Sequence, residues 1–204
     1  VLYSAGGDST LLALNARTGE PLWRFSFAKA GAKGGINAAL VRQGGNLIAT
    51  HESENLDSSE IGRMAAFRIP RPDEVKPTNS IIPHVFPPKT FEVWRNGVGS
   101  LASSPVVVGN RIYEVNGTGE LCCVDADSGK VLWKKKVGIE QRQSTPFYAD
   151  GYLYVAMYVT MKDSKSATTS DADSVANGDL IVLKPSDDGA EEVSRTQLVG
   201  RCFG

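Results

Sequence analysis

Two adjacent cysteines are the residues of this sequence best suited to redox chemistry. Cys122 and Cys123 stand in an apolar run, and consecutive side chains on a strand point to opposite faces of the sheet. A disulfide between neighbours would need a strained, non-extended peptide. We therefore predict that both thiols are reduced and buried, because a free cysteine behaves as a small hydrophobe.

The two histidines are the next candidates for chemistry. His51 ends an apolar run beside Glu52, and we interpret it as a surface or loop histidine, because no partner for a general base can be identified. His84 lies in the apolar, proline-rich segment 81–88, which predicts an extended arm. The arm either docks another subunit or domain or lies across its own domain, and we favour the second arrangement.

A calcium site is the third kind of chemistry that the residue types suggest. Asp171, Asp173 and Asn177 are spaced somewhat like ligands of a calcium loop. However, Val175 stands at a ligand position, and no glutamate follows at the distance that the EF-hand template requires. We interpret this polar segment as a surface loop.

The composition excludes several classes of protein. The chain has 204 residues, with 22 Lys and Arg against 23 Asp and Glu, for a net charge of −1. This balance provides no basic footprint for nucleic acid or for an anionic lipid surface. The longest nearly apolar run, residues 151–161, is shorter than the ~20 residues that span a bilayer. The chain begins with Val1 and not with Met, so we interpret both of its ends as cuts within a longer protein.

One phrase occurs twice and identifies an internal repeat. Residues 9–24 read STLLALNARTGEPLWR and residues 119–134 read GELCCVDADSGKVLWK. Each copy has an apolar strand, an Asn or Asp that can bind the amides of a turn, a glycine for positive φ, and a tryptophan on the return strand. The matched pairs are Ala13 and Cys123, Asn15 and Asp125, Gly19 and Gly129, and Trp23 and Trp133.

Strands and tight turns surround each copy of the phrase. Residues 103–137 predict four consecutive antiparallel strands, and residues 36–96 repeat this order with Trp94 in the fourth strand and a proline-rich insertion at 70–88. Residues 144–200 form a weaker copy in which Val193 stands where the tryptophan would be, while residues 1–27 supply only three strands. Periodic meanders with one tryptophan per unit favour a β-propeller.

The phrase resembles the tryptophan-docking repeat of pyrroloquinoline-quinone (PQQ) type, or quinoprotein alcohol dehydrogenase-like, β-propellers. The resemblance implies an all-β fold of four-stranded antiparallel blades, with each tryptophan docked between neighbouring blades. Members are typically eight-bladed, so residues 1–204 would form a single incomplete domain of about four blades, with pieces at about 1–27, 36–96, 103–137 and 144–200. We expect Trp23 and Trp133 to be largely buried.

The resemblance does not extend to a cofactor site. The PQQ enzymes of this type hold quinone and calcium with Glu, Asn and Asp side chains, and a catalytic Asp acts as base, but no position here matches those residues one by one. Their ring-forming disulfide joins adjacent cysteines, whereas Cys122 and Cys123 occupy positions that are aromatic and alanine in the repeat. We therefore predict no catalytic, cofactor-binding or metal-binding residue and no bound cofactor.

The resulting functional prediction is a non-catalytic, extracytoplasmic scaffold or protein-binding module, located in the periplasm or outside the cell by family resemblance. The alternative is a PQQ- and calcium-dependent quinoprotein alcohol or sugar dehydrogenase. A protein partner would bind the inter-blade loops, with the insertions at 53–61, 70–90 and 160–177 as natural contacts. An incomplete ring would leave apolar blade faces, which a homodimer completing the ring, another domain or further chain would cover. A closed four-bladed ring is the less favoured arrangement.

Overall fold

The computed structural model describes residues 1–29, 36–76, 81–139, 143–158 and 178–198, and its regular structure is nearly all β. Within these residues no helix has the length and apolar character needed to cross a membrane. The elements are β1 (Leu2–Ala5), β2 (Thr10–Leu14), β3 (Pro21–Ser26), β4 (Val41–Gln43), β5 (Asn46–Glu54), β6 (Ile61–Arg68), the 3-10 turn η1 (Pro72–Glu74), β7 (His84–Val85), β8 (Glu92–Asn96), β9 (Val106–Val108), β10 (Arg111–Val115), β11 (Glu120–Asp125), β12 (Val131–Lys136), β13 (Phe147–Ala149), β14 (Tyr152–Tyr158), β15 (Gly178–Pro185) and β16 (Ala190–Leu198).

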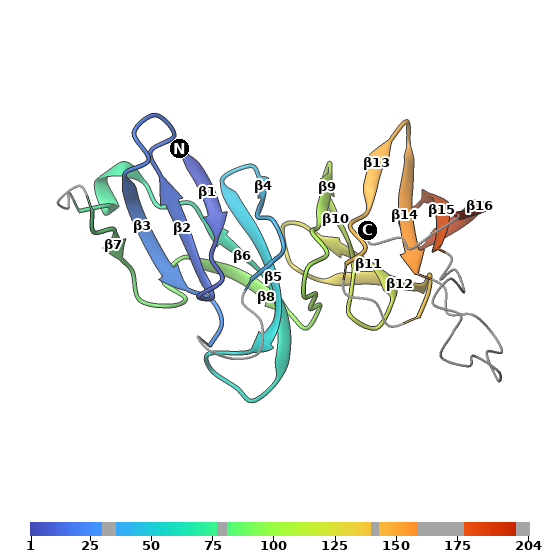
Figure 1. Ribbon diagram of the computed structural model, residues 1–204, viewed down its shortest axis with the longest axis horizontal. Coiled ribbons are helices and arrows are strands. Elements are labelled where there is room, and N and C mark those ends of the chain that lie inside the picture. The colour runs from blue at the N-terminus through green and yellow to red at the C-terminus, as the bar shows by residue number, and fades with distance from the viewer. Residues whose placement is uncertain (30–35, 77–80, 140–142, 159–177, 199–204) are drawn as a thin grey trace, which may run out of the picture.

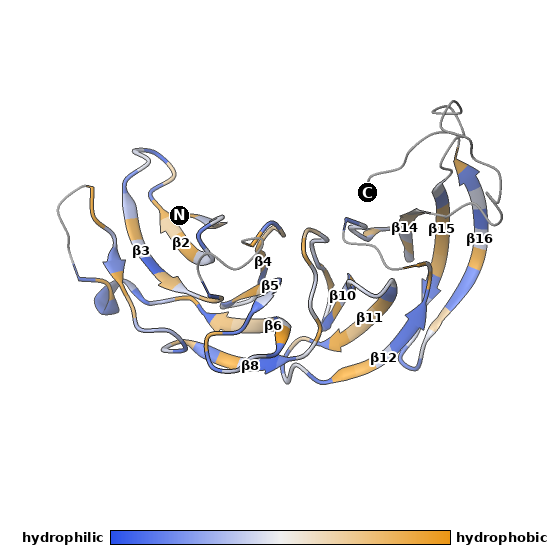
Figure 2. Ribbon diagram, turned by 60° about the horizontal axis from the view of Figure 1, so that its bottom comes forward, coloured by the Kyte–Doolittle hydropathy of each residue, from blue (hydrophilic) through white to orange (hydrophobic). Residues whose placement is uncertain are grey.

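These strands form four sheets of four strands each, joined in chain order (Figure 1). The first sheet has the order β1-β2-β3-β7, the second β4-β5-β6-β8, the third β9-β10-β11-β12 and the fourth β13-β14-β15-β16. Figure 2 shows the sheets following one another along an open arc, with β8, β12 and β16 on its outer side. This arrangement confirms the predicted β-propeller fold of four-stranded sheets.

The first sheet gains its fourth strand from the proline-rich insertion. β7 pairs in parallel with β3, bringing Trp23 opposite His84 and Arg24 opposite Val85. The Phe86 amide continues the pairing by donating to the Arg24 carbonyl at 2.9 Å. The sequence predicted only three strands here, because a two-residue strand within a proline-rich segment has no periodicity to reveal it.

The core lies at the junctions between sheets, where three apolar clusters fill the space. The three tryptophans are part of these clusters, with exposed fractions of 3% for Trp23, 7% for Trp94 and 8% for Trp133. The prediction that Trp23 and Trp133 are buried is therefore confirmed. Each sheet contributes to the core of its neighbours, as in repeat proteins whose units bury little surface alone.

In each sheet that has a tryptophan, a small residue lies directly opposite it on the neighbouring strand. Trp23, Trp94 and Trp133 pair across the sheet with Ala13, Ala66 and Cys123 respectively. A β-bulge follows each pairing, and this irregularity recurs in the fourth sheet between Val182 and Leu183.

The bulge corrects one prediction about the weak copy of the motif. Val182 pairs with Ser194, and Leu183 pairs with Glu192, so Val193 falls within the bulge. Ser194, and not Val193, therefore occupies the register of the tryptophans. An extra residue in one strand shifts the register, and counting along the sequence does not detect that shift.

The bounds of the second unit also differ from the predicted piece at about 36–96. Its first strand, β4, begins only at Val41, and its second strand, β5, continues to Glu54. Part of the insertion predicted at 53–61 is therefore strand, and the turn that joins β5 to β6 is shorter. The proposed loops at 160–177 and the acidic residues at 171–177 lie outside the described residues.

Candidate functional site

The adjacent cysteines lie on β11 with both side chains buried and free. Cys122 belongs to the cluster between the second and third sheets, while Cys123 belongs to the cluster between the third and fourth sheets. Burial raises the pKa of Cys122 to about 12 and that of Cys123 to about 11. Both groups are therefore neutral thiols at physiological pH and poor nucleophiles, in agreement with the prediction of reduced, buried side chains.

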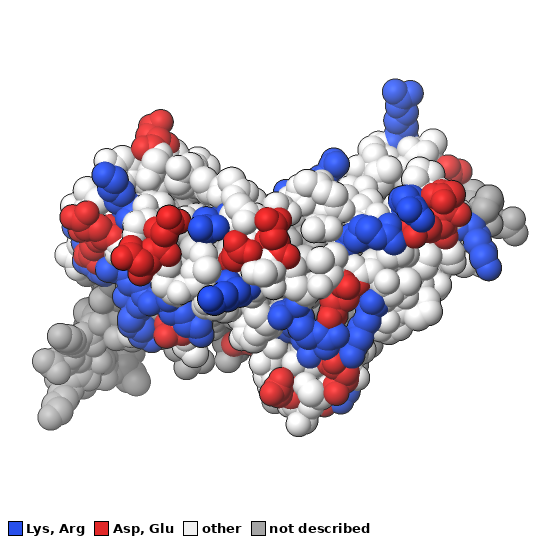
Figure 3. Space-filling view, turned by 180° about the vertical axis from the view of Figure 1, so that it is seen from behind, with Lys and Arg blue, Asp and Glu red and all other residues white. Residues whose placement is uncertain are grey.

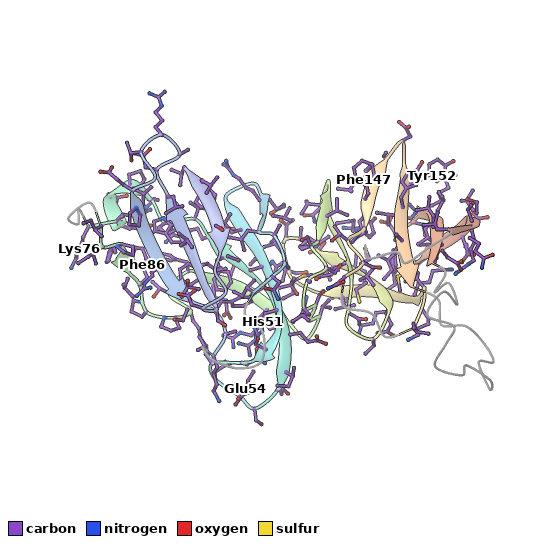
Figure 4. All side chains as sticks on the ribbon, viewed as in Figure 1. His51, Glu54, Lys76, Phe86, Phe147 and Tyr152 are labelled. Atoms are coloured by element: carbon purple, nitrogen blue, oxygen red, sulfur yellow. The ribbon has the colours of Figure 1, made fainter. Side chains whose placement is uncertain are left out.

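His51 is buried, so the prediction of a surface or loop histidine is wrong. Its ring meets the edge of Phe27 at a centroid distance of 4.5 Å and an angle of 90°, and its Nδ1 accepts a hydrogen bond from the Ser53 amide at 3.1 Å. Burial and the nearby Arg63 lower the pKa of His51 to about 4. The reason for the error is the length of β5, which carries His51 inside the strand and against the first sheet (Figure 4).

A polar layer between the second and third sheets was not predicted. Glu114 is completely buried on β10, and burial raises its pKa well above the usual range, while Thr50 and Ser100 lower it less. Neither of its carboxyl oxygens has a hydrogen-bond partner with good geometry among the described residues. The carboxyl group is therefore protonated at neutral pH, since an unpaired buried carboxylate is strongly disfavoured.

The sequence contained a faint signal of this layer. Glu114 is the fourth residue of β10, and the fourth residues of β5 and β14 are Ala49 and Val155, both completely buried. An acidic residue thus stands where the second and fourth sheets have an apolar one and the first sheet has Ser4. Only alignment of the repeats by their hairpin turns, and not the composition of the strand, would have singled it out.

No group of three His, Cys, Asp or Glu side chains that could hold a metal occurs within the described ranges. The most buried carboxyl, Glu114, has hydroxyl groups and not a second carboxylate around it. The cysteines are separated by the sheet and form no disulfide.

The proline-rich arm lies against the first sheet, as we favoured from the sequence. Glu74 of η1 accepts two hydrogen bonds from the Arg68 guanidinium, each at 2.8 Å, and one from the Arg71 amide at 2.7 Å. These bonds, led by the one from Arg68, lower the pKa of Glu74 to about 2. Further along, the Lys76 amide donates to Nδ1 of His84 at 3.0 Å. The start of the arm is therefore fixed at several points.

The end of the arm is held by aromatic packing. Phe86 is buried and meets Phe91 edge-on at 4.7 Å, while His84 lies 4.2 Å from Phe86. In Figure 4 Lys76 and Phe86 lie together at the free side of the first sheet. Just before this anchor, Ile81 is 84% exposed and Ile82 is 64% exposed, so the residues that lead into β7 present apolar side chains to solvent.

A pocket of about 520 Å³ lies between the first sheet and the start of the arm. Most of its lining is apolar or aromatic, and two charged residues complete it. The lining residues are Val1, Tyr3, Glu20, Pro21, Leu22, Trp23, Pro70, Pro72, Val75 and Lys76. This volume is within the range of about 300–1,000 Å³ that is typical of ligand pockets.

The surface has no large region of a single charge on the face that Figure 3 shows, where basic and acidic side chains alternate. Asp57 is an example, because it pairs with Arg63 at 2.8 Å and also contacts Lys89 and Arg95. These contacts, chiefly the one with Lys89, hold the pKa of Asp57 far below its usual range.

Comparison with solved structures places the fold among propellers. The chain is similar to a quinohemoprotein alcohol dehydrogenase, ADHIIG, from Pseudomonas putida HK5, with 14% identity and a TM-score of 0.55 over 97% of this chain and 32% of that one. It is also similar to BamB from Moraxella catarrhalis, with 17% identity and a TM-score of 0.49 over 95% of this chain and 57% of that one. The chain thus spans just over half of one relative and about a third of the other.

Comparison of the sequence gives the family. No curated protein matches the chain in sequence. A family model described as outer membrane protein assembly factor BamB matches residues 80–187, which is more than half of the chain. The match covers the return strand with Trp94, all of the third sheet and most of the described fourth sheet. The chain therefore belongs to this family of PQQ-type propeller repeats, described as outer membrane protein assembly factor BamB.

Proposed function

We propose that the protein is a non-catalytic scaffold that binds another protein outside the cytoplasm, in the periplasm or at the cell surface. The description of its family as an outer membrane assembly factor supports this function and this location. The likeness to a dehydrogenase supports the fold alone, because one propeller fold serves many functions.

The observation that carries the proposal is the exposed apolar part of the arm. Ile81, Ile82 and Val85 are 84%, 64% and 56% exposed, although their neighbours His84 and Phe86 are held by the Lys76 amide and by Phe91. Clustered apolar side chains on an ordered surface segment are typical of protein interaction sites. A rigid base also reduces the entropy lost on binding.

A test of the proposal places a photo-crosslinking amino acid at Ile82 in the full-length protein, expressed in cells. Lys184, which is exposed on β15 of the fourth sheet, is the matched control position. We expect irradiation to produce a discrete adduct with one envelope protein from position 82 and none from position 184. Equal labelling at both positions would contradict the proposal.

A second experiment tests for catalysis directly. Purified full-length protein is incubated with PQQ and calcium, and reduction of an electron-accepting dye is followed with alcohols and sugars. We expect no turnover above that of the protein without quinone. Turnover of any of these substrates would replace the scaffold by a quinoprotein dehydrogenase.

A further inference from the structure

Two of the three tryptophans use their indole N–H in the same way. Trp94 Nε1 donates to the Ala126 carbonyl at 2.9 Å, and Trp133 Nε1 donates to the Ser186 carbonyl at 3.1 Å. Both acceptors directly follow the third strand of the next sheet, since β11 ends at Asp125 and β15 ends at Pro185. In both cases the backbone just after that strand therefore supplies the carbonyl that accepts the indole N–H.

Trp23 lacks such a carbonyl acceptor. Its side chain is almost completely buried, but its Nε1 has no hydrogen-bond acceptor among the described residues. The third strand of the next sheet, β6, ends at Arg68, and the chain continues into the arm through Pro70 and η1 instead of turning back. The carbonyl of Ile69, which follows β6, accepts from the Arg68 guanidinium at 3.2 Å and not from Trp23. The pocket of about 520 Å³ lies between this divergent segment and Trp23.

The walls of the pocket are apolar and are held in place by contacts outside it. Trp23 packs against Tyr3 at a centroid distance of 5.9 Å and stacks on Phe25 at 5.7 Å. On the other side, the Arg68–Glu74 pair and the Lys76–His84 hydrogen bond fix η1 and the residues after it. A preformed site of this kind needs little rearrangement to bind a ligand.

We infer that this pocket binds an extended, proline-containing segment of a partner protein. The inference rests on the proposed scaffold function and identifies a site for it. The occupant is indicated by the other two junctions, where backbone with a carbonyl acceptor covers the indole. A polyproline II segment exposes its carbonyls because it has no internal hydrogen bonds, and its rings pack well in aromatic-lined grooves.

The lining residues match such a segment in more detail. The Trp23 N–H provides one donor, the partly buried ring of Tyr3 provides an apolar contact, and Pro70 and Pro72 form the facing wall. The two charged lining residues, Glu20 and Lys76, are both exposed, so they would meet the solvated parts of the peptide. Burial of prolines against aromatic rings supplies most of the affinity, and the indole fixes the position of the backbone.

The test measures peptide binding by fluorescence anisotropy with the full chain. The probe is a fluorescein-labelled decapeptide that alternates proline and leucine, and the reference probe is a Gly-Ser decapeptide of equal length. We expect saturable binding of the proline peptide at micromolar concentrations, as is usual for short peptides in preformed grooves, and no saturation with the Gly-Ser peptide.

Two variants and their matched controls locate the site. Trp23→Phe removes the free N–H, and we expect about fivefold to tenfold weaker binding. Trp133→Phe removes an N–H that already has an internal acceptor, so the affinity should stay within about twofold of the unchanged protein. Pro72→Asp places a charge in the wall and should abolish binding, whereas Val93→Asp, at an exposed site on β8, should not.

The possible outcomes separate this inference from the proposed function. Absence of peptide binding, or binding that Trp23→Phe and Pro72→Asp leave unchanged, would overturn the pocket as the site. Binding of small apolar dyes that the proline peptide does not displace would also overturn it. In either case the adduct from position 82 would still report whether the protein is a scaffold, because that residue lies outside the pocket lining.

Discussion

The two faces of the third sheet make junctions of different chemistry. Toward the fourth sheet the contact is apolar, with Val115 and Leu121 facing Val155 and Met157 in one cluster. Toward the second sheet the same strand, β10, presents Glu114 to Thr50 and Ser100. Both junctions carry a tryptophan that donates to a carbonyl of the neighbouring sheet.

The difference shows that two junctions can share the same strand and tryptophan geometry and still bury side chains of different polarity. The apolar junction owes its stability to area removed from water, which does not depend on pH. The junction with Glu114 also contains a group that is stable there only when protonated. One sheet is therefore joined to its neighbours through one core that is apolar and one core that weakens as the pH rises, while the Arg111–Asp187 ion pair lies at the edge of the apolar one.

Removal of the indoles is expected to have the largest effect on both junctions. Trp94→Ala and Trp133→Ala should each lower the free energy of unfolding by about 3–5 kcal/mol, because each leaves a cavity in the core. Trp94→Phe, which keeps a ring and loses the hydrogen bond to Ala126, should cost less. Urea denaturation measures these changes. Losses below about 1 kcal/mol would show that the indoles do not hold the sheets together.

The polar layer predicts a pH dependence of smaller size. The pKa of Glu114 is raised in the folded protein, so the folded state binds more protons than the unfolded state above the ordinary pKa of about 4.3. Stability therefore falls as the pH rises, by up to about 1.4 kcal/mol per pH unit from this group, until Glu114 ionises. Glu114→Gln should remove this decline. Urea denaturation at a series of pH values between about 5 and 8 measures it.

Glu120 provides a control of opposite sign on the adjoining strand. Its pKa is lowered, chiefly by a hydrogen bond from Asn116, so the stability that it contributes is present at neutral pH and is lost as the pH falls. Glu120→Gln should therefore destabilise the protein more at neutral pH than in acid. If Glu114→Gln and Glu120→Gln changed the pH profile in the same direction, the assignment of a protonated Glu114 would be wrong.

The features predicted correctly from the sequence are those that short segments determine. The turn between β2 and β3 needs an acceptor at Asn15, positive φ at Gly19 and a bulky residue at Trp23, and all of these lie within one phrase. The second copy of the phrase, residues 119–134, predicted the strands of the third sheet in the same way. The fold class follows from such local patterns, because most of the strand pairs join consecutive strands of a meander.

The features that were missed depend on residues distant in the sequence. His51 is buried because Phe27 of the first sheet lies against it, and Glu114 is notable because Thr50 of another sheet faces it. Trp23 lacks the acceptor that the other two indoles have, because the carbonyl of Ile69, which follows β6, accepts from the guanidinium of Arg68 instead. Ser194 replaced Val193 in the register because of a bulge. None of these follows from periodicity within one strand.

The smallest expected effect compares two turn glycines that have the same conformation. Gly19 and Gly129 have φ values of 75° and 72°, so alanine at either position costs about 1 kcal/mol in backbone strain. A methyl group at Gly19 meets open space, whereas one at Gly129 overlaps the ring of Trp94. Gly129→Ala should therefore be more destabilising than Gly19→Ala by about 1–2 kcal/mol. Equal losses in urea denaturation would mean that Trp94 moves aside freely, and that close packing of the indole on the turn contributes little to this junction.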